Sequence, residues 1–232
     1  MKSIKIYTVL AFTGVLLCFI CSCKKDDKDL KIEYGSVTDI DGNIYKTVKI
    51  GTQWWMAENL KTVRYNNGDS IPNVKILNDW IHLTVGAYCN YDNDENNVST
   101  YGRLYNWYTL NDERKLAPTG WHISTDLEWD ILTNYLGGEV LAGGRLKETN
   151  TLHWKSPNSG ANNLSGFTAL PGGFRQHAGP FISIGYIGVF WTDTEYGMDK
   201  ALKQILWFHE SYIEKSLWEY KNAGLSIRCV KN

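Results

Sequence analysis

The chain has 232 residues and a formal net charge of −1 at pH 7, so nothing in its charge suggests a nucleic-acid partner. The length suits one large domain or two small ones, and no linker-like stretch follows Lys31, which favours one domain. Ten tryptophans and fourteen tyrosines are unusually many, and such side chains serve both protein cores and sugar-binding surfaces.

The first 22 residues have the pattern of a secretory signal peptide. Lys2 and Lys5 precede an apolar run over residues 6–20, which is too short to span a bilayer comfortably. Residues 20–23 read Ile-Cys-Ser-Cys, which resembles the lipobox of bacterial lipoproteins. The resemblance implies that Cys23 is acylated and becomes the mature N-terminus, and several acyl chains would anchor it firmly. An ordinary signal peptide with an incidental Cys23 is the alternative.

Residues 23–35 are predicted to form a charged tether. Residues 24–31 are lysines and aspartates with a single leucine, so they are expected to stay solvated. A charged, acidic segment at this place also resembles the surface-export signals of Bacteroidetes lipoproteins. We therefore expect an outer-membrane protein, exposed at the cell surface, whose lipid anchor makes the membrane its partner.

Residues 36–59 predict a meander of three antiparallel strands. The strands are expected at residues 36–40, 44–50 and 53–59. Asp41-Gly42 is a strong hairpin signal between the first two strands. In the third strand Trp54, Trp55 and Met56 place bulky groups on both faces, which predicts that both faces are covered.

Residues 65–79 and 92–97 are expected to be polar loops. The second loop begins like a calcium-binding EF-hand loop, but Asn97 stands where glycine is needed and Arg103 where glutamate is needed. A calcium site of another geometry is the alternative to a solvated acidic loop. The aromatic-rich residues 101–110 fit neither a helix nor a strand clearly.

Residues 125–138 give the clearest helix signal. Thr125 and Glu128 have the spacing of a capping box, and Gly137 stands where the helix would end. One apolar stripe at helical spacing is expected to face the core, namely Leu127, Ile131, Leu132, Tyr135 and Leu136.

The C-terminal half alternates glycines with short apolar runs. Strands are expected at residues 167–170, 182–187, 188–192, 201–208 and 225–230, with a tight turn at Pro171-Gly172-Gly173. The predicted fold class is therefore α+β, with short antiparallel strands, few helices and long loops. The side chains expected to be buried are Trp55, Trp121, Trp129, Leu132, Phe167, Leu170, Trp191 and Ile227.

Three cysteines follow residue 22. If Cys23 is lipidated, Cys89 and Cys229 remain as an even pair in an oxidising compartment, where a disulfide is the natural expectation. Two separate buried thiols are the alternative, because the sequence does not show that the two residues are close.

Five segments, in this order, are similar to one bacterial family. They are residues 53–60; 86–89 with 101–108; 117–123 with 126–129; 166–175; and 191–195 with 224–231. Together they resemble the Fibrobacter succinogenes major paralogous domain over residues 36–232. The family is one of secreted and lipid-anchored proteins without an established biochemical role. The resemblance implies a single C-type-lectin-like domain, a fold that also includes the formylglycine-generating enzymes.

A non-catalytic binding module for a glycan or another extracellular ligand is the first functional hypothesis. Sugar rings stack on exposed indoles, while asparagine and aspartate bind the hydroxyls. The candidate residues are Trp80, Trp107, Trp154 and Trp218, with Asp92, Asp94 and Asn96. For any single tryptophan, a place in the core is the more common role. A structural or adhesin role, with an extracellular protein as partner, is the second hypothesis.

Catalysis has weaker support in the sequence. The formylglycine-generating enzymes use two nearby cysteines to bind copper, whereas residues 217–222 hold no cysteine and Cys229 matches only the closing strand. The five histidines lack metal-ligand spacing, and His122 is expected to be a core histidine. No nucleophile elbow of the form G-x-S-x-G is present. We therefore expect neither an enzyme nor a cofactor, with calcium left as the open question.

Overall fold

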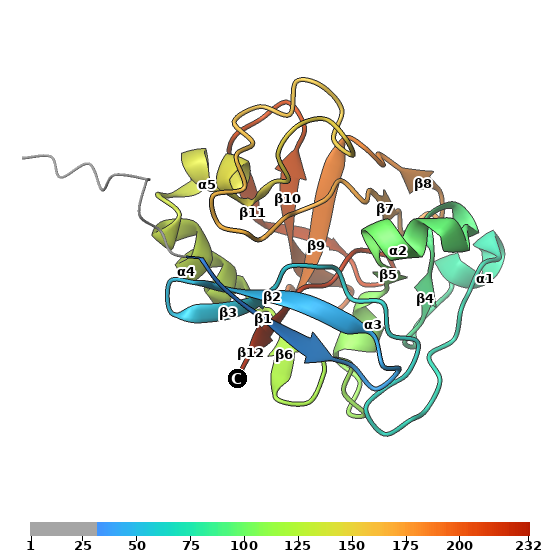
Figure 1. The fold of residues 1–232 in the computed structure, drawn as a ribbon. Helices are drawn as coiled ribbons and strands as arrows, with labels where there is room; N and C mark the ends of the chain where they lie inside the picture. Colours follow the sequence, from blue (N-terminus) through green and yellow to red (C-terminus); the bar gives the residue numbers. More distant parts are fainter. Residues whose placement is uncertain (1–31) are drawn as a thin grey trace, which may run out of the picture. The chain divides into compact units, whose positions relative to one another are not determined.

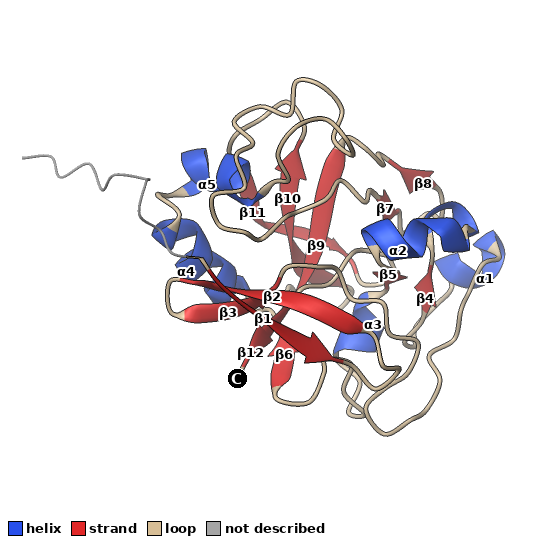
Figure 2. Cartoon of the chain, in the orientation of Figure 1, coloured by secondary structure: helices blue, strands red, loops and turns tan. Residues whose placement is uncertain are grey.

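Two antiparallel sheets and two packed helices organise residues 32–232, which are the residues that the computed structural model describes (Figure 1). Short strands, short helices and long loops make up the rest (Figure 2), so the predicted α+β class is confirmed. The predicted signal peptide, Cys23 and the tether up to Lys31 lie outside the described residues. Within the described part of the chain, no helix combines the length and apolar character needed to cross a membrane.

The first sheet has the strand order β1-β2-β3-β12-β6. Its strands are β1 (Glu33–Thr38), β2 (Ile44–Ile50), β3 (Gln53–Met56), β6 (Trp121–Ile123) and β12 (Cys229–Lys231). The predicted hairpin forms at Asp41-Gly42, where Gly42 has a φ of 82°. β1 begins before residue 36, inside the predicted tether, because Glu33 pairs with Lys49 of β2 in register and in an ion pair.

The second sheet has the strand order β11-β10-β9. Its strands are β9 (Ile187–Glu195), β10 (Lys200–Trp207) and β11 (Ile213–Tyr220). β9 and β10 confirm the strands predicted at residues 188–192 and 201–208. β11 has no counterpart in the sequence prediction, because its residues mix charged and apolar types without a regular alternation.

Four predicted strands are shorter than expected or absent, and the one predicted at residues 53–59 ends at Met56. Residues 167–170 form only one bridge, from Ala169 to Lys147, and are not a strand. Of residues 182–187, only the start forms β8 (Phe181–Ile182), which pairs with β7 (Phe174–Arg175). Leu225 and Ser226 make single bridges to Tyr105 and Phe190, and residues 227–228 belong to no strand before β12 begins. These segments thread between elements, so their backbone groups bond to several partners rather than to one neighbouring strand.

Helix α4 (Asp126–Tyr135) has the predicted capping box between Thr125 and Glu128. Its predicted apolar stripe is only partly confirmed, because Leu132 and Leu136 are buried as expected and the other three residues are not. Leu127, Ile131 and Tyr135 are exposed, whereas the buried face consists of Trp129, Leu132, Thr133 and Leu136. The physical reason is that the Trp129 indole, the largest side chain of the helix, enters the core, and this turns Leu127, Ile131 and Tyr135 outward. A second helix, α5 (Glu139–Leu146), was not expected from the sequence.

Trp129 lies at the centre of the core between the two sheets. The centre of its ring lies 5.1 Å from that of Trp55 on β3, 5.5 Å from that of Phe167 and 5.6 Å from that of Phe190 on β9. Such tilted aromatic contacts add to the free energy of burying the rings. Trp191 and Ile227 are fully buried as predicted, but two expected core residues, Trp121 and Leu170, are only partly buried.

Short elements between residues 77 and 110 form the remaining side of the fold (Figure 1). They are α1 (Leu77–Ile81), β4 (Tyr88–Cys89), η2 (Tyr91–Asn93), η3 (Glu95–Asn97), α2 (Val98–Tyr101), β5 (Leu104–Tyr105) and α3 (Trp107–Leu110). Gly102, with a φ of 74°, ends α2, and Asn106 caps α3 by accepting the Thr109 N–H. Residues 101–110 therefore contain three short elements, which explains why no single period describes them.

Candidate functional site

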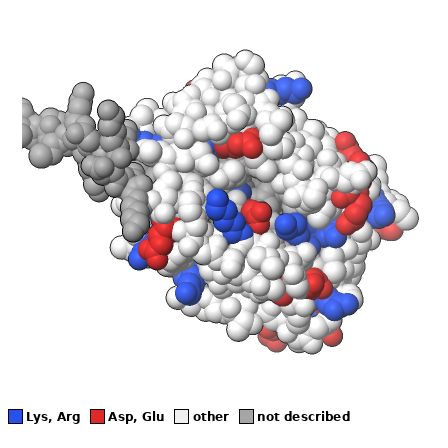
Figure 3. Space-filling view, in the orientation of Figure 1, with Lys and Arg blue, Asp and Glu red and all other residues white. Residues whose placement is uncertain are grey.

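A cavity of about 300 Å³ opens between the loops that follow β3, α2 and α5. Figure 3 shows a hollow in the middle of this face, with acidic and basic side chains beside it. We call it the central cavity. Its lining residues are Ala57, Glu58, Asn59, Lys61, Ser99, Thr100, Gly102, Glu148, His153, Thr168, Leu170 and Arg228. Five segments that lie far apart in the sequence therefore meet here.

Arg228 is the most buried charged group of the central cavity, with 1% of its surface exposed. Its Nε donates to Asn59 Oδ1 at 2.6 Å, and its Nη1 donates to the carbonyls of Met56 and Phe167, both at 2.9 Å. Its Nη2 donates to the carbonyl of Thr168 at 3.1 Å. Burial lowers the pKa of Arg228 to about 9, because removal from water disfavours the charged form.

Thr168 adopts a left-handed backbone conformation, with a φ of 54°. A β-branched residue rarely takes this conformation, and strain of this kind is typically held by its surroundings. Here Asn163 Oδ1 accepts the Thr168 N–H at 2.9 Å, and Asn163 Nδ2 donates to Thr168 Oγ1 at 3.0 Å. The same conformation presents the Thr168 carbonyl to Arg228 at the cavity wall.

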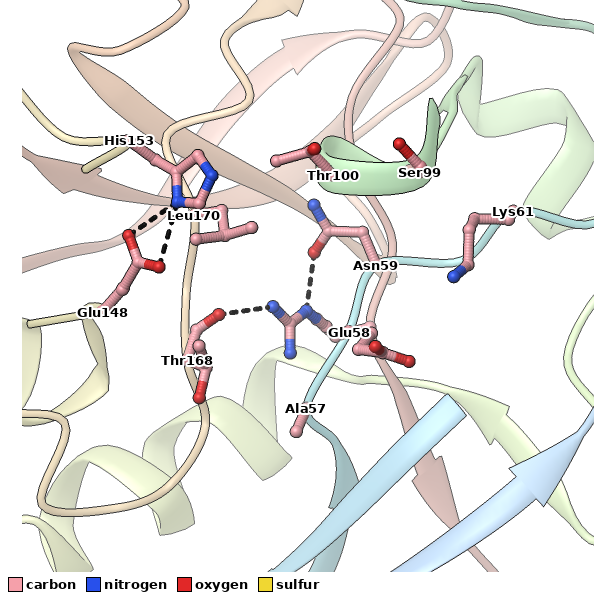
Figure 4. Close-up of a pocket in the computed structure, with 12 residues that line it drawn as sticks. Ala57, Glu58, Asn59, Lys61, Ser99, Thr100, Glu148, His153, Thr168 and Leu170 are labelled. Atoms are coloured by element: carbon pink, nitrogen blue, oxygen red, sulfur yellow. Dashed lines mark hydrogen bonds and ion pairs between the residues drawn. The ribbon is translucent and has the colours of Figure 1, made fainter. Parts of the chain in front are cut away.

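Glu148 and His153 form a partly buried pair on one side of the cavity (Figure 4). His153 Nδ1 lies 2.9 Å from both carboxylate oxygens of Glu148. The ring of Tyr101 meets the imidazole edge to face at 5.8 Å. Both residues lie after α5. The contacts of His153 with Glu148 and with Tyr101 give the imidazole a defined orientation.

The opposite side of the cavity carries hydroxyl and charged groups. Ser99 and Thr100 lie on α2, and Lys61 lies on the neighbouring segment (Figure 4). Glu58 is exposed, and its Oε2 accepts the backbone N–H of Lys46 at 3.1 Å. The cavity thus combines carboxylate, ammonium, hydroxyl and imidazole groups with two apolar side chains, Ala57 and Leu170. Such a wall can form directional hydrogen bonds to a polar ligand.

Most of the chain matches one known protein family. A family model, described as the Fibrobacter succinogenes major domain, matches residues 48–231. The chain belongs to this family. Searches among curated proteins and among solved structures gave no match.

The part matched to the Fibrobacter succinogenes major domain includes every wall of the central cavity. Segments 53–60, 166–175 and 224–231, which carried the resemblance, supply Asn59, Thr168 and Arg228. Sequence reasoning used these segments to recognise the family but did not predict that they meet. It also missed the Glu148–His153 pair, for which no local motif exists.

Three of the four tryptophans proposed as ligand contacts are core residues in this family member. Trp80, Trp107 and Trp154 are exposed by 0%, 3% and 1%, respectively, so the prediction that they contact ligand is wrong. Their indoles fill the interior, and those of Trp107 and Trp154 donate to the backbone carbonyls of Thr192 and Ala169. Trp218 is 46% exposed on β11, outside the central cavity.

The polar loop at residues 92–97 is also outside the cavity lining. Asp94 caps η3 by accepting the N–H groups of Asn96, and Glu95 pairs with Arg103 at 2.8 Å. Asp92 is exposed. Within residues 32–232, no group of three or more histidine, cysteine or acidic side chains is placed to hold a metal ion. The structure thus gives no ligand set for the calcium alternative at this loop, which stays a prediction.

Cys89 and Cys229 are free thiols, so the predicted disulfide is wrong and the alternative of two buried thiols holds. Cys89 packs with Trp80 and Leu104, whereas Cys229 on β12 belongs to a different hydrophobic cluster. Burial raises the pKa of the Cys89 thiol to about 12, and it raises the pKa of Cys229 as well. Both thiols are therefore protonated at neutral pH.

His122 is only partly buried, contrary to the prediction of a core histidine. It lines a second cavity of about 450 Å³, and its ring nitrogens lie 2.7 Å from Glu128 Oε1 and from Asn232 Oδ1. Burial alone would lower the pKa of His122, but the hydrogen bonds to Asn232 and Glu128 raise it above its usual value. Glu128 thus serves both the helix cap and this histidine.

Proposed function

We propose that the protein is a non-catalytic binding module of the cell surface, which takes a small hydroxyl-rich ligand such as the end of a glycan into the central cavity. The observation that carries this proposal is the composition of the cavity wall. Carboxylates, hydroxyls, an imidazole and a guanidinium from five chain segments line one space of about 300 Å³. That volume is at the lower end for small-molecule sites, so it suits a single sugar ring.

The chemistry of sugars fits the groups present. Sugar hydroxyls both donate and accept hydrogen bonds, and the cavity offers acceptors at Glu58 and Glu148 and two-way groups at Ser99 and Thr100. Leu170 offers an apolar surface for ring carbons. The strained Thr168 supports a functional role for the site, because such strain clusters where ligands bind.

The proposed location at the cell surface rests on the N-terminal sequence. The signal-like residues 1–22 and Cys23 support a lipid anchor in the outer membrane, and the charged residues after Cys23 support a tether. The C-type-lectin-like relationship stays a prediction. The oxidase alternative finds little support, since Cys89 and Cys229 are protonated thiols in separate clusters.

An adhesin role is the second candidate, and exposed apolar side chains favour it. Trp218 and Leu217 on β11, with Tyr196 and Met198 in the hairpin between β9 and β10, are all at least 40% exposed. The ammonium of Lys200 lies 3.9 Å from the centre of the Trp218 ring. Exposed aromatic side chains are typical of protein interfaces.

A glycan array probed with the detergent-purified full chain separates the two functions. We expect binding to a defined set of glycans that is lost in Thr100→Val, because that change removes a hydroxyl from the cavity without changing its size. The matched control is Trp218→Ala, which leaves the cavity intact and should bind as the wild type does. Absence of binding to any glycan, or loss of binding only in Trp218→Ala, contradicts the cavity proposal.

A further inference from the structure

The guanidinium of Arg228 has one donor that its protein contacts do not use. An arginine side chain carries five N–H groups. Asn59, Met56, Phe167 and Thr168 accept four of them, and Nη2 makes only one of its two hydrogen bonds within residues 32–232. The side chain is 1% exposed and lines the central cavity. A buried N–H without an acceptor is costly, so a ligand atom that accepts it gains affinity.

Glu58 is the acidic side chain whose charge acts on Arg228, where it favours the protonated form, but the two residues form no ion pair. The four acceptors of Arg228 are uncharged oxygens, and no acidic side chain of the described residues forms an ion pair with it. A buried cation normally requires a partner of opposite charge. The cavity therefore favours a ligand that brings negative charge to this wall.

Lys61 supplies a second cation to the same cavity. Its ammonium lies 5.2 Å from the centre of the Tyr45 ring, and it forms no ion pair with a described acidic residue. Lys61 lies two residues after Asn59 on the same segment (Figure 4), and Asn59 Oδ1 accepts the Nε–H of Arg228. Lys61 and Arg228 thus both line the central cavity.

The two acidic residues of the cavity are engaged differently. Both carboxylate oxygens of Glu148 contact His153 Nδ1 at 2.9 Å, so this carboxylate is turned toward the imidazole. Glu58 is exposed and accepts only a backbone N–H. Glu58 and Glu148 are both carboxylates of the lining, and Glu58 lies on the same segment as Lys61, where its charge would oppose an anionic ligand.

We infer that the central cavity selects sugars that carry an anionic oxygen group, the carboxylate of a uronic acid or a sulfate ester, which binds Lys61 and the unused N–H of Arg228. This inference rests on the proposed glycan-binding function. In it, the ring hydroxyls contact Thr100 and Ser99, and Glu58 weakens binding by repulsion. Charge-assisted hydrogen bonds are stronger than neutral ones, so the acidic group dominates selection.

Matched pairs of acidic and neutral glycans test this inference. The probes are oligogalacturonides with their carboxyl-reduced forms, and chondroitin sulfate with its desulfated form, measured by titration calorimetry on the detergent-purified full chain. We expect at least one acidic probe to bind about tenfold more tightly than its neutral form. The two pairs distinguish carboxylate from sulfate. Preference for neutral glycans would overturn the inference and leave the proposed function standing, whereas no binding to any probe or to the array would contradict both.

Two opposite substitutions sharpen the test. Lys61→Gln should weaken binding of the acidic probe about tenfold and leave neutral glycans unaffected. Glu58→Gln keeps an acceptor oxygen and should strengthen binding of the acidic probe severalfold. Lys49→Gln, on β2 outside the cavity lining, is the control and should change neither. An unchanged affinity in Lys61→Gln, or weaker acid binding in Glu58→Gln, with thermal unfolding like that of the wild type, would overturn the inference.

Discussion

Some single residues in this protein connect segments that lie far apart in the sequence. Arg228 joins Asn59, Met56, Phe167 and Thr168 through one guanidinium group. Only arginine offers five donors in a rigid plane, so a lysine at this place would leave several carbonyls unpaired. The residue therefore both holds the cavity walls together and presents a donor to the cavity.

Lys147 is a second buried cation, and it gives a pH-dependent prediction. It is 0% exposed, and its ammonium donates to the carbonyls of Ser159, Trp207 and Glu210 at 2.7–2.9 Å. Burial lowers the pKa of Lys147 from 10.5 to about 8. The unfolded chain therefore binds more protons between these values, so this group makes the free energy of unfolding rise with pH across that window.

The measurement compares urea unfolding of the wild type with that of Lys147→Met. The wild type should gain about 2 kcal/mol relative to the variant between about pH 7 and about pH 9.5. Taking the difference cancels the titration of other groups. A difference that stays flat across this range would show that the folded protein does not perturb the lysine.

At the scale of elements, α4 shows that apolar spacing predicts a helix better than it predicts which face is buried. Thr125 and Glu128 set the start of the helix by local hydrogen bonds, and both were recognised in the sequence. The buried face depends on the space between β3 and β9, where the Trp129 indole fits. That space is formed by residues far from the helix.

The two faces of α4 should respond differently to truncation. Trp129→Ala is expected to lower the free energy of unfolding by about 3–5 kcal/mol, because it leaves a cavity between the sheets. Leu127→Ala, on the exposed side of the same helix, should change it by less than about 0.5 kcal/mol. Urea unfolding followed by circular dichroism measures both. Equal losses would contradict the assignment of Leu127 to the exposed face of the helix.

At the scale of the whole molecule, the family match and the proposed lipid anchor lie in different parts of the chain. The family match covers residues 48–231 and the central cavity, whereas the lipobox-like sequence lies before the described residues. A surface role for the cavity needs both parts. The anchor can be tested without knowledge of the ligand.

Cys23→Ala is expected to move the protein from the membrane fraction to the soluble fraction, because it removes the acyl chains that would hold it there. Cys21→Ala is the matched control, since it changes the neighbouring cysteine and keeps a small residue before the cleavage site. Immunoblotting of washed membranes measures the outcome. A Cys23→Ala protein that stays in the membrane fraction contradicts the anchor.

The sequence by itself determined the local elements and the family. Three local features can be recognised in the sequence because each depends on residues only a few positions apart. They are the hairpin at Asp41-Gly42, the alternation of apolar and polar residues in β2, and the capping box of α4. The five family-like segments were recognisable for the same reason. The sequence also suggested that most tryptophans are structural, which the burial of Trp80, Trp107 and Trp154 agrees with.

Only the tertiary structure decided where the chemistry lies. In the folded chain Cys89 and Cys229 are separate free thiols, and Trp129 is on the buried face of α4. Glu148 and His153 line the same cavity as Arg228. Each of these facts depends on contacts between segments many residues apart. Such contacts are set by packing and by the pairing of buried polar groups over the whole fold, and no short pattern in the chain encodes them.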